Sequence, residues 1–236
     1  MTTVCTRTIA ILMIGIAVSL VGSSVPAESI TVYHTDFSDT TTGEVPAGWT
    51  VVDAYGTWEV DDNDELTLSA VSDDSSIVCD AAGVLTDFTV SATFHNGAGR
   101  AGLVGRLQDA DNYYVLRVAG TTYLDLYWIG ANDAYERMKH VALDPDYVYG
   151  EMCTMSLTFE GSTISGEIRN ASDVVMGSFT DEDTRIASGK AGVRANALSF
   201  GCAEFTITAP APIPEPGAVA LLISALAGLL VVRRKR

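Results

Sequence analysis

The sequence predicts an all-β protein: a two-sheet antiparallel sandwich of jelly-roll type, flanked by an N-terminal signal peptide and a C-terminal transmembrane helix. Three observations support this fold class. Between its two ends the chain consists of short stretches in which apolar and polar residues alternate, which is the period of a strand. Gly, Asp and Asn interrupt these stretches about every 8 to 12 residues, as turns do. No segment there shows the i, i+3, i+4, i+7 stripe of an amphipathic helix.

Residues 1–27 are typical of a secretory signal peptide. Arg7 precedes an uncharged apolar run of 13 residues over 9–21, and small residues follow up to Ala27. The pattern predicts export by the Sec translocation machinery and cleavage between Ala27 and Glu28. A permanent membrane helix is the alternative, but the run is shorter than the roughly 20 residues that span a bilayer.

Residues 28–209 form the predicted sandwich domain. Over 88–94 every second residue is apolar and the residues between are Thr or Ser, and the segment 153–159 repeats this pattern. About a dozen such strands in ~180 residues must stack or close their sheets, which a two-sheet sandwich achieves. We expect Trp49 and Trp58 in its core.

The C-terminal end has the pattern of a membrane anchor behind a stiff spacer. A proline-rich spacer over 210–216 leads into the apolar segment 217–232, and four basic residues follow at 233–236. Proline keeps the spacer extended, and the positive-inside rule places the basic residues in the cytoplasm. At ~1.5 Å per residue the apolar segment reaches only ~24 Å, less than the ~30 Å hydrocarbon core, so the anchor is weak.

The last 23 residues combine three features in order: Pro214, Glu215 and Pro216, a short hydrophobic helix, and the basic cluster Arg233, Arg234, Lys235 and Arg236. This arrangement resembles the PEP-CTERM sorting signal of Gram-negative bacteria. The resemblance implies transient anchoring in the inner membrane and cleavage near the PEP motif by an exosortase, a membrane cysteine protease. It also implies release to the cell surface or the extracellular space, where exopolysaccharide is abundant. An ordinary anchor with a proline stalk is the alternative, which explains the helix but not the tripeptide.

The body between the two ends is strongly acidic. The whole chain has 30 Asp and Glu against 14 Lys and Arg. Five basic residues (Arg7 and the last four) and one acidic residue (Glu215) belong to the ends. Residues 28–214 therefore hold nine basic and 29 acidic groups, a net charge of −20. This excludes a nucleic-acid-binding domain, because neutralising phosphates needs a surface rich in Lys and Arg.

Several short motifs follow one another within residues 28–209 in an order that is typical of a known group of folds. They are Asp36-Phe37, Gly48-Trp49-Thr50, Trp58-Glu59-Val60, Asp87-Phe88-Thr89-Val90, Ala101-Gly102-Leu103-Val104-Gly105-Arg106, Asn112-Tyr113-Tyr114-Val115-Leu116 and Ser188-Gly189-Lys190-Ala191-Gly192-Val193. In this order they resemble the concanavalin-like sandwiches, which include laminin-G-like domains and the 3-keto-disaccharide hydrolase domain. The resemblance implies the same architecture, but a family that holds lectin-like binders, structural modules and enzymes does not decide function.

The densest acidic run is a candidate calcium site. Asp61, Asn63, Asp64 and Glu65 place oxygen-bearing side chains close together, and these repel one another unless a cation lies among them. The run departs from the EF-hand loop, which needs Gly where Leu66 stands. The alternative is a hairpin turn, since Asp and Asn favour turn conformations. Calcium is the one cofactor that the sequence suggests.

Catalytic patterns are weak. Glu59 and Asp64 loosely match the paired-carboxylate strand of some sandwich glycosidases, but the residues between them do not alternate as a core-facing strand would. His34, His95 and His140 lie far apart, and no Gly-x-Ser-x-Gly elbow occurs. We therefore expect a non-enzymatic protein, with a carbohydrate-active enzyme of the 3-keto-disaccharide hydrolase type as the alternative.

Tyrosines on one strand are the candidate glycan-binding residues. In the alternating stretch 123–129, Tyr123, Asp125 and Tyr127 share one face, and the apolar residues Leu124, Leu126 and Trp128 take the other. Exposed aromatic rings with a polar group nearby can stack on a pyranose ring. Packing of these rings within the core is the alternative. The function expected from the whole sequence is an exported binding or structural module associated with polysaccharide.

Three cysteines remain once the signal peptide is removed: Cys79, Cys153 and Cys202. In an oxidising compartment this number predicts one disulfide and one buried thiol. The sequence does not indicate which two would pair.

Overall fold

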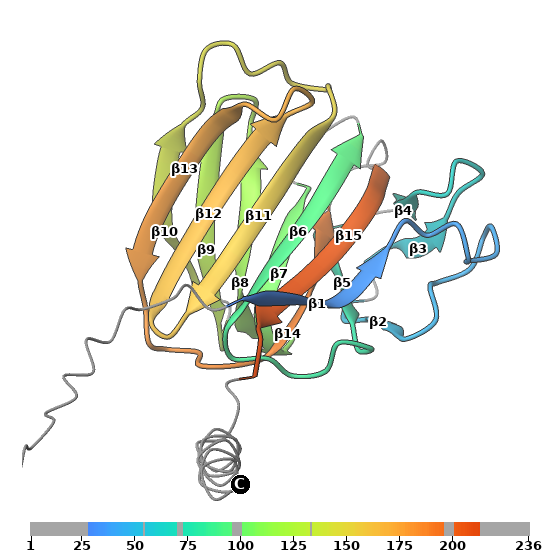
Figure 1. Cartoon of the computed structure of the whole chain (residues 1–236), viewed down its shortest axis with the longest axis horizontal. Coiled ribbons are helices and arrows are strands. Elements are labelled where there is room, and N and C mark those ends of the chain that lie inside the picture. Colours follow the sequence, from blue (N-terminus) through green and yellow to red (C-terminus); the bar gives the residue numbers. More distant parts are fainter. Residues whose placement is uncertain are drawn as a thin grey trace, which may run out of the picture.

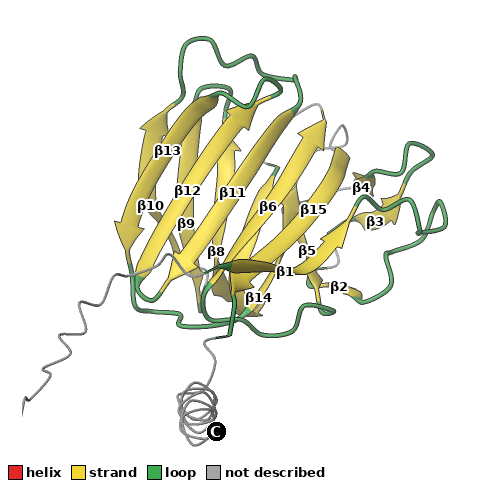
Figure 2. Ribbon diagram, in the orientation of Figure 1, coloured by secondary structure: helices red, strands yellow, loops and turns green. Residues whose placement is uncertain are grey.

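The computed structural model describes residues 28–53, 55–69, 73–95, 101–132, 134–195 and 201–212, which form a two-layer β-sandwich (Figure 1). Its strands are β1 (Ser29–Thr35), β2 (Trp49–Val51), β3 (Thr57–Val60), β4 (Leu66–Ser69), β5 (Ser75–Cys79), β6 (Phe88–His95), β7 (Gly102–Asp109), β8 (Asn112–Ala119), β9 (Tyr123–Gly130), β10 (Ala134–Ala142), β11 (Cys153–Glu160), β12 (Thr163–Asn170), β13 (Val175–Glu182), β14 (Lys190–Ala195) and β15 (Gly201–Pro210). The described residues contain no helix (Figure 2).

The strands form two antiparallel sheets, so the predicted fold class is confirmed. The eight-stranded sheet has the order β13-β12-β11-β6-β15-β4-β3, and β1 also pairs with β15. The seven-stranded sheet has the order β10-β9-β8-β7-β14-β5-β2. In Figure 1 the eight-stranded sheet lies in front and the seven-stranded sheet behind it. Each sheet therefore has an inner face toward the core and an outer face away from it.

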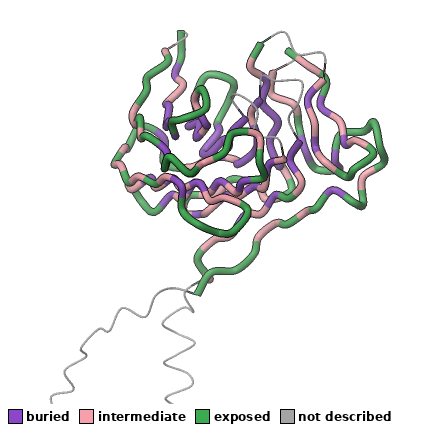
Figure 3. The backbone as a smooth tube through the Cα atoms, turned by 90° about the horizontal axis from the view of Figure 1, so that it is seen from above, coloured by how far each residue is buried: buried purple, intermediate pink, exposed green. Residues whose placement is uncertain are grey.

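The core lies between the two inner faces and follows the predicted alternation. Strands β6 and β11 alternate between buried and half-buried residues along their length, and Figure 3 shows such alternation along the strands. Phe88, Phe94 and Phe159 are among the largest fully buried side chains. Trp49 and Trp58 belong to the same cluster, as predicted. Burying one such apolar side chain, compared with leaving it exposed, stabilises the folded state by about 1.5–3 kcal/mol.

The predicted disulfide is wrong, because Cys79, Cys153 and Cys202 are all free and buried. Cys153 and Cys202 lie opposite the same residue, Phe94, on the two sides of β6. One strand therefore separates them, and strands ~4.8 Å apart leave their Cα atoms roughly 9–10 Å from each other. A disulfide needs about 4.4–6.8 Å. Cys79 lies on β5 in the opposite sheet.

We expect the three thiols to be unreactive in the native protein. Burial raises the pKa of Cys153 to about 11 and also raises the pKa of Cys79 and Cys202, so little thiolate is present at neutral pH. A short alkylation without reductant should leave all three unlabelled, and the same alkylation in denaturant should label all three. If peptide mapping showed that two of the cysteines resist alkylation in denaturant until a reductant is added, a disulfide would be present and the register just described would be contradicted.

The predicted processing segments fall mostly outside the described residues. Ala27, the PEP tripeptide, the apolar segment 217–232 and the terminal basic cluster all lie there. Among the residues that the structure does describe, no helix is long and apolar enough to cross a membrane. Ser29 on β1 pairs with Pro210 on β15, so the two boundaries of the sandwich lie side by side.

Candidate functional site

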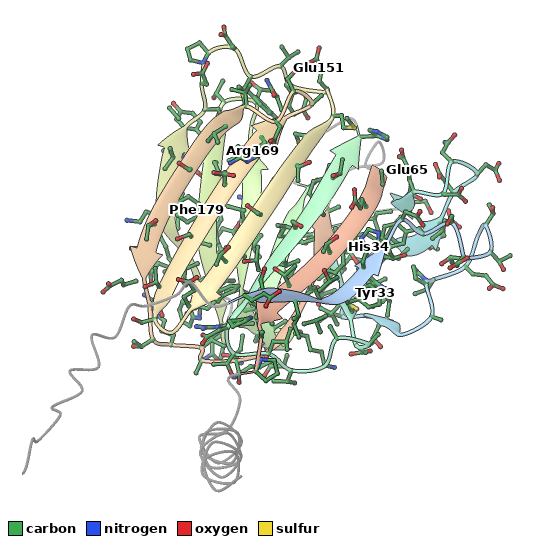
Figure 4. The ribbon with its side chains drawn as sticks, viewed as in Figure 1. Tyr33, His34, Glu65, Glu151, Arg169 and Phe179 are labelled. Carbon is green, nitrogen blue, oxygen red and sulfur yellow. The ribbon has the colours of Figure 1, made fainter. Side chains whose placement is uncertain are left out.

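The two outer faces of the sandwich differ in chemistry. The outer face of the eight-stranded sheet carries Ser and Thr hydroxyls that hydrogen-bond across strands, as between Thr89 and Thr158 (2.8 Å) and between Ser165 and Thr180 (3.1 Å). Figure 4 shows this face toward the viewer and labels Arg169 on β12. Such a surface is typical of a sheet face that meets solvent.

The outer face of the seven-stranded sheet carries a second apolar cluster. Its buried members are Val78, Val104, Leu107, Tyr113, Val115 and Tyr127. Strand pairing also places a polar row across this face, in the order Arg194, Gly102, Arg117, Asp125 and His140. Apolar groups buried on an outer face require cover from long side chains or connecting loops. Side chains and loop residues therefore cover part of this face.

A cavity of about 420 Å³ lies on this outer face. Its lining is Asp53, Tyr55, Asp73, Asp74, Ala110, Asp111, Tyr113, Ile129, Gly130, Ala134, Tyr135 and Arg194. We call it the tyrosine cavity. The volume falls in the range of small-molecule sites, roughly 300–1,000 Å³. The lining combines aromatic rings, carboxylates and one guanidinium, so it can offer both ring faces and hydrogen-bond partners to a ligand.

The ring of Tyr135 in the tyrosine cavity is held in place by neighbouring side chains of the same outer face. The ring of Tyr135 packs on that of Tyr127 with centroids 4.4 Å apart. The Arg117 guanidinium lies 4.4 Å from the centroid of Tyr127 and 5.6 Å from that of Tyr135. Tyr135 is nevertheless 48% exposed and Tyr55 is 52% exposed. Because Tyr127 and Arg117 already hold the ring of Tyr135, this ring would lose little entropy when a ligand stacks on its exposed part.

The carboxylates of the tyrosine cavity outnumber its cations. Among the described residues of the lining, Arg194 is the only cation. Its Nη2 atom donates to Asp74 Oδ2 at 2.8 Å, and its Nη1 atom donates to the Tyr113 hydroxyl. The second oxygen of Asp74, Oδ1, is buried without a hydrogen-bond partner in the described part of the chain. Burial raises the pKa of Asp53, and the nearby charges of Asp111 and Asp74 raise it further against the opposing effect of Arg194.

Asp53→Asn should make the protein more stable at neutral pH. Because the pKa of Asp53 is raised in the folded state, stability is greatest below the ordinary pKa of the group and falls as the pH rises through the folded value. Asparagine keeps the shape of the side chain and removes the charge. The melting temperature of the variant should exceed that of the parent at pH 7, and the difference should vanish near pH 3. A variant that melts lower at pH 7 would contradict the assigned charge repulsion.

The predicted glycan-binding residues lie on this face but outside the tyrosine cavity. Asp125 is fully buried, and it accepts hydrogen bonds from the Tyr127 hydroxyl (2.8 Å) and from Nδ1 of His140 (2.6 Å). Tyr127 is itself only 7% exposed, so the expectation of an exposed ring is wrong for this residue because Tyr135 and Arg117 pack on it. Tyr123 is partly exposed and stacks on His140 with centroids 4.0 Å apart.

The acidic run forms the turn between β3 and β4. One oxygen of Asp61 accepts the backbone N–H groups of Asn63 (2.9 Å) and Glu65 (3.0 Å), and Asp64 has a φ of 60°. Glu65 is directed to His95 instead, with which it forms a hydrogen bond. The run is therefore organised as a hairpin turn. The described residues include no group of three or more His, Cys, Asp or Glu that could hold a metal ion.

The weak catalytic patterns do not assemble into one site. Glu59 accepts a hydrogen bond from the Ser69 hydroxyl at 3.1 Å, beside the turn that contains Asp64. His34 contacts Thr206, whereas His140 contacts Asp125 on the opposite sheet. The three histidines thus lie in separate environments, as their sequence separation predicts.

No family model matches the sequence, and a search of curated proteins finds no match. Solved structures with the same architecture are found. The exoplasmic/lumenal domain of VIP36 in its Ca²⁺/Man-bound form has a TM-score of 0.54 at 8% identity, over 78% of this chain and 92% of that one. The CBM2 module of the Lactobacillus casei BL23 phage J-1 evolved Dit has a TM-score of 0.53 at 13% identity, over 78% and 97%.

The carbohydrate-binding module CBM66 from Bacillus subtilis has a TM-score of 0.51 at 18% identity, over 69% of this chain and 91% of that one. The fold is the lectin-type β-sandwich. At these identities the likeness concerns the fold alone, and the chemistry must come from the side chains of this chain.

Proposed function

We propose that the protein is an exported bacterial surface or extracellular-matrix protein whose sandwich binds carbohydrate in the tyrosine cavity. The observation that carries the proposal is the cavity itself, where the accessible rings of Tyr55 and Tyr135 stand beside carboxylates. Tyrosine rings can stack on sugar rings, and carboxylates accept hydrogen bonds from sugar hydroxyls. The lectin-type fold, which a named carbohydrate-binding module shares, supports the same proposal.

Delivery to the surface is the second part of the proposal. The signal peptide would direct the chain through the Sec machinery, with cleavage after Ala27. The PEP-CTERM resemblance supports a transient inner-membrane anchor and processing by an exosortase near Pro214 to Pro216. The released sandwich would then meet exopolysaccharide at the cell surface or in the extracellular matrix.

A carbohydrate-active enzyme is the second candidate function. One observation favours it: burial and neighbouring carboxylates raise the pKa of Asp53, and a carboxyl in this state can act as a general acid. We propose a binder nevertheless. Asp53 and Asp111 share the cavity lining with Asp73 and Asp74, and such a polar lining suits hydrogen bonds to sugar hydroxyls.

A glycan array with the full-length protein in mild detergent tests the proposal. We expect retention on a subset of polysaccharides without release of product from any of them. If no glycan retained the protein, the proposed binding function would be contradicted. Product formation that Asp53→Asn abolishes would replace the binder with the enzyme.

A further inference from the structure

We propose that the tyrosine cavity selects sugars that carry a positively charged amino group, such as the glucosamine units of a de-N-acetylated polysaccharide. The inference deepens the proposed carbohydrate-binding function and rests on it. Four aspartates and one arginine contribute to the lining. Since a protonated amine is a compact cation with three hydrogen-bond donors, it matches a cavity that offers carboxylate acceptors beside aromatic rings.

The first argument is the unbalanced charge within the cavity. Arg194, which is the only cation that the described residues contribute to the lining, forms an ion pair with Asp74 at 2.8 Å. In the part of the chain that the structure describes, Asp53, Asp73 and Asp111 have no Lys, Arg or His within ion-pair distance. A cationic ligand would supply a partner charge in the cavity, whereas a neutral sugar would leave these three carboxylates without one.

The second argument is that the rings of this site already bind cations. The Arg194 guanidinium lies 5.6 Å from the ring centroid of Tyr113, and that of Arg117 lies 5.6 Å from the ring centroid of Tyr135. Both distances are within cation–π range, about 6 Å. Tyr135 is 48% exposed, so part of its ring can face a ligand cation in the same way. Aromatic rings and unpaired carboxylates at one cavity are the combination that recognises ammonium groups.

The third argument concerns the ionisation of Asp53 and the long-range attraction of a cationic ligand. Burial, and to a smaller extent the charges of Asp111 and Asp74, raise the pKa of Asp53 against the attraction of Arg194, and a bound ammonium beside it would favour the ionised carboxylate. Residues 28–214 carry a net charge of −20. A field of this sign attracts a cationic polysaccharide and repels an acidic one. Both the local and the overall charge therefore favour an amine-bearing glycan.

The test uses the full-length protein on an array that pairs each amino-sugar glycan with its N-acetylated and neutral counterparts of equal length. We expect at least about 10-fold tighter binding of the free-amine member of a pair, with the preference shrinking in high salt. Asp53→Asn should remove the preference. The exposed loop variant Asp146→Asn removes the same unit of charge away from the cavity and should keep it.

The outcomes separate the inference from the proposed function. Since Asp53→Asn is expected to raise stability, its loss of preference cannot be assigned to unfolding. Binding without preference for the amine, or equal loss of preference in both variants, overturns the inference and leaves the binding function in place. Absence of binding to every glycan on the array overturns both.

Discussion

Arg106→Leu should lower the free energy of unfolding by about 3–5 kcal/mol, the cost of breaking a buried network of charge-assisted hydrogen bonds. Arg106 is 1% exposed. Its Nη1 atom donates to the carbonyl oxygen of Ile186, and its Nη2 atom donates to those of Thr86 and Gly161, each at 2.8 Å. The guanidinium also lies 4.7 Å from the ring centroid of Phe159. Leucine would leave three carbonyl groups from three separate connections without their donor.

Urea unfolding of the full-length protein measures the effect, with two further variants for comparison. Arg106→Lys keeps the charge but cannot reach all three carbonyls, so its cost should be intermediate. Arg169→Leu removes an arginine from the outer face of the eight-stranded sheet, where it pairs with Glu167. That substitution should cost at most about 1 kcal/mol. If Arg106→Leu proved no more costly than Arg169→Leu, Arg106 would not join the connections as described.

Trp49→Ala should destabilise the protein by about 3–5 kcal/mol, the usual cost of removing a large aromatic side chain from a core. Trp49 lies on β2 at the edge of the seven-stranded sheet, and its ring contacts Phe205 of the other sheet with centroids 4.7 Å apart. The rings of Phe37 and Tyr33 lie 5.9 Å and 6.1 Å away, and the indole N–H donates to the Tyr33 hydroxyl at 2.9 Å. Alanine would leave a cavity where the two sheets meet.

Trp49→Phe separates packing from hydrogen bonding. Phenylalanine keeps an aromatic ring but loses the indole donor, so we expect a smaller cost than for alanine, with about 1 kcal/mol of it from the lost hydrogen bond. Chemical denaturation of the three proteins side by side gives the comparison. Equal costs for alanine and phenylalanine would show that the ring contributes no packing at this position.

The strands and the core could be predicted because their pattern is local. The alternation over 88–94 and 153–159 places apolar residues on one face whatever their partner strands are. Trp49 and Trp58 could be assigned to the core because large aromatic side chains beside short apolar runs are usually buried. The disulfide could not be tested from the sequence, because it depends on register: β6 lies between the two strands that carry Cys153 and Cys202.

The buried guanidinium and the tyrosine cavity depend on contacts between distant segments. Arg106 ends a motif that predicts only an aliphatic strand. The carbonyl groups that it binds, at residues 86, 161 and 186, belong to three different loops between strands, one before Arg106 in the sequence and two after it. The sequence predicted the shared face of Tyr123, Asp125 and Tyr127 correctly. It could not show that Tyr135 on the neighbouring strand packs on Tyr127, or that Asp53 and Asp111 line one cavity with Tyr135.

The account depends most on where carbohydrate binds, and the affinity of two alanine variants measures this directly. Tyr135 lines the tyrosine cavity, whereas Tyr123 lies on the same outer face beside His140 and outside the lining. For a glycan that the parent protein retains, Tyr135→Ala should weaken binding about 10-fold or more, as expected for an aromatic residue central to a site. Tyr123→Ala should leave the affinity within about twofold. The reverse result, a loss with Tyr123→Ala and none with Tyr135→Ala, would contradict the assignment of the cavity.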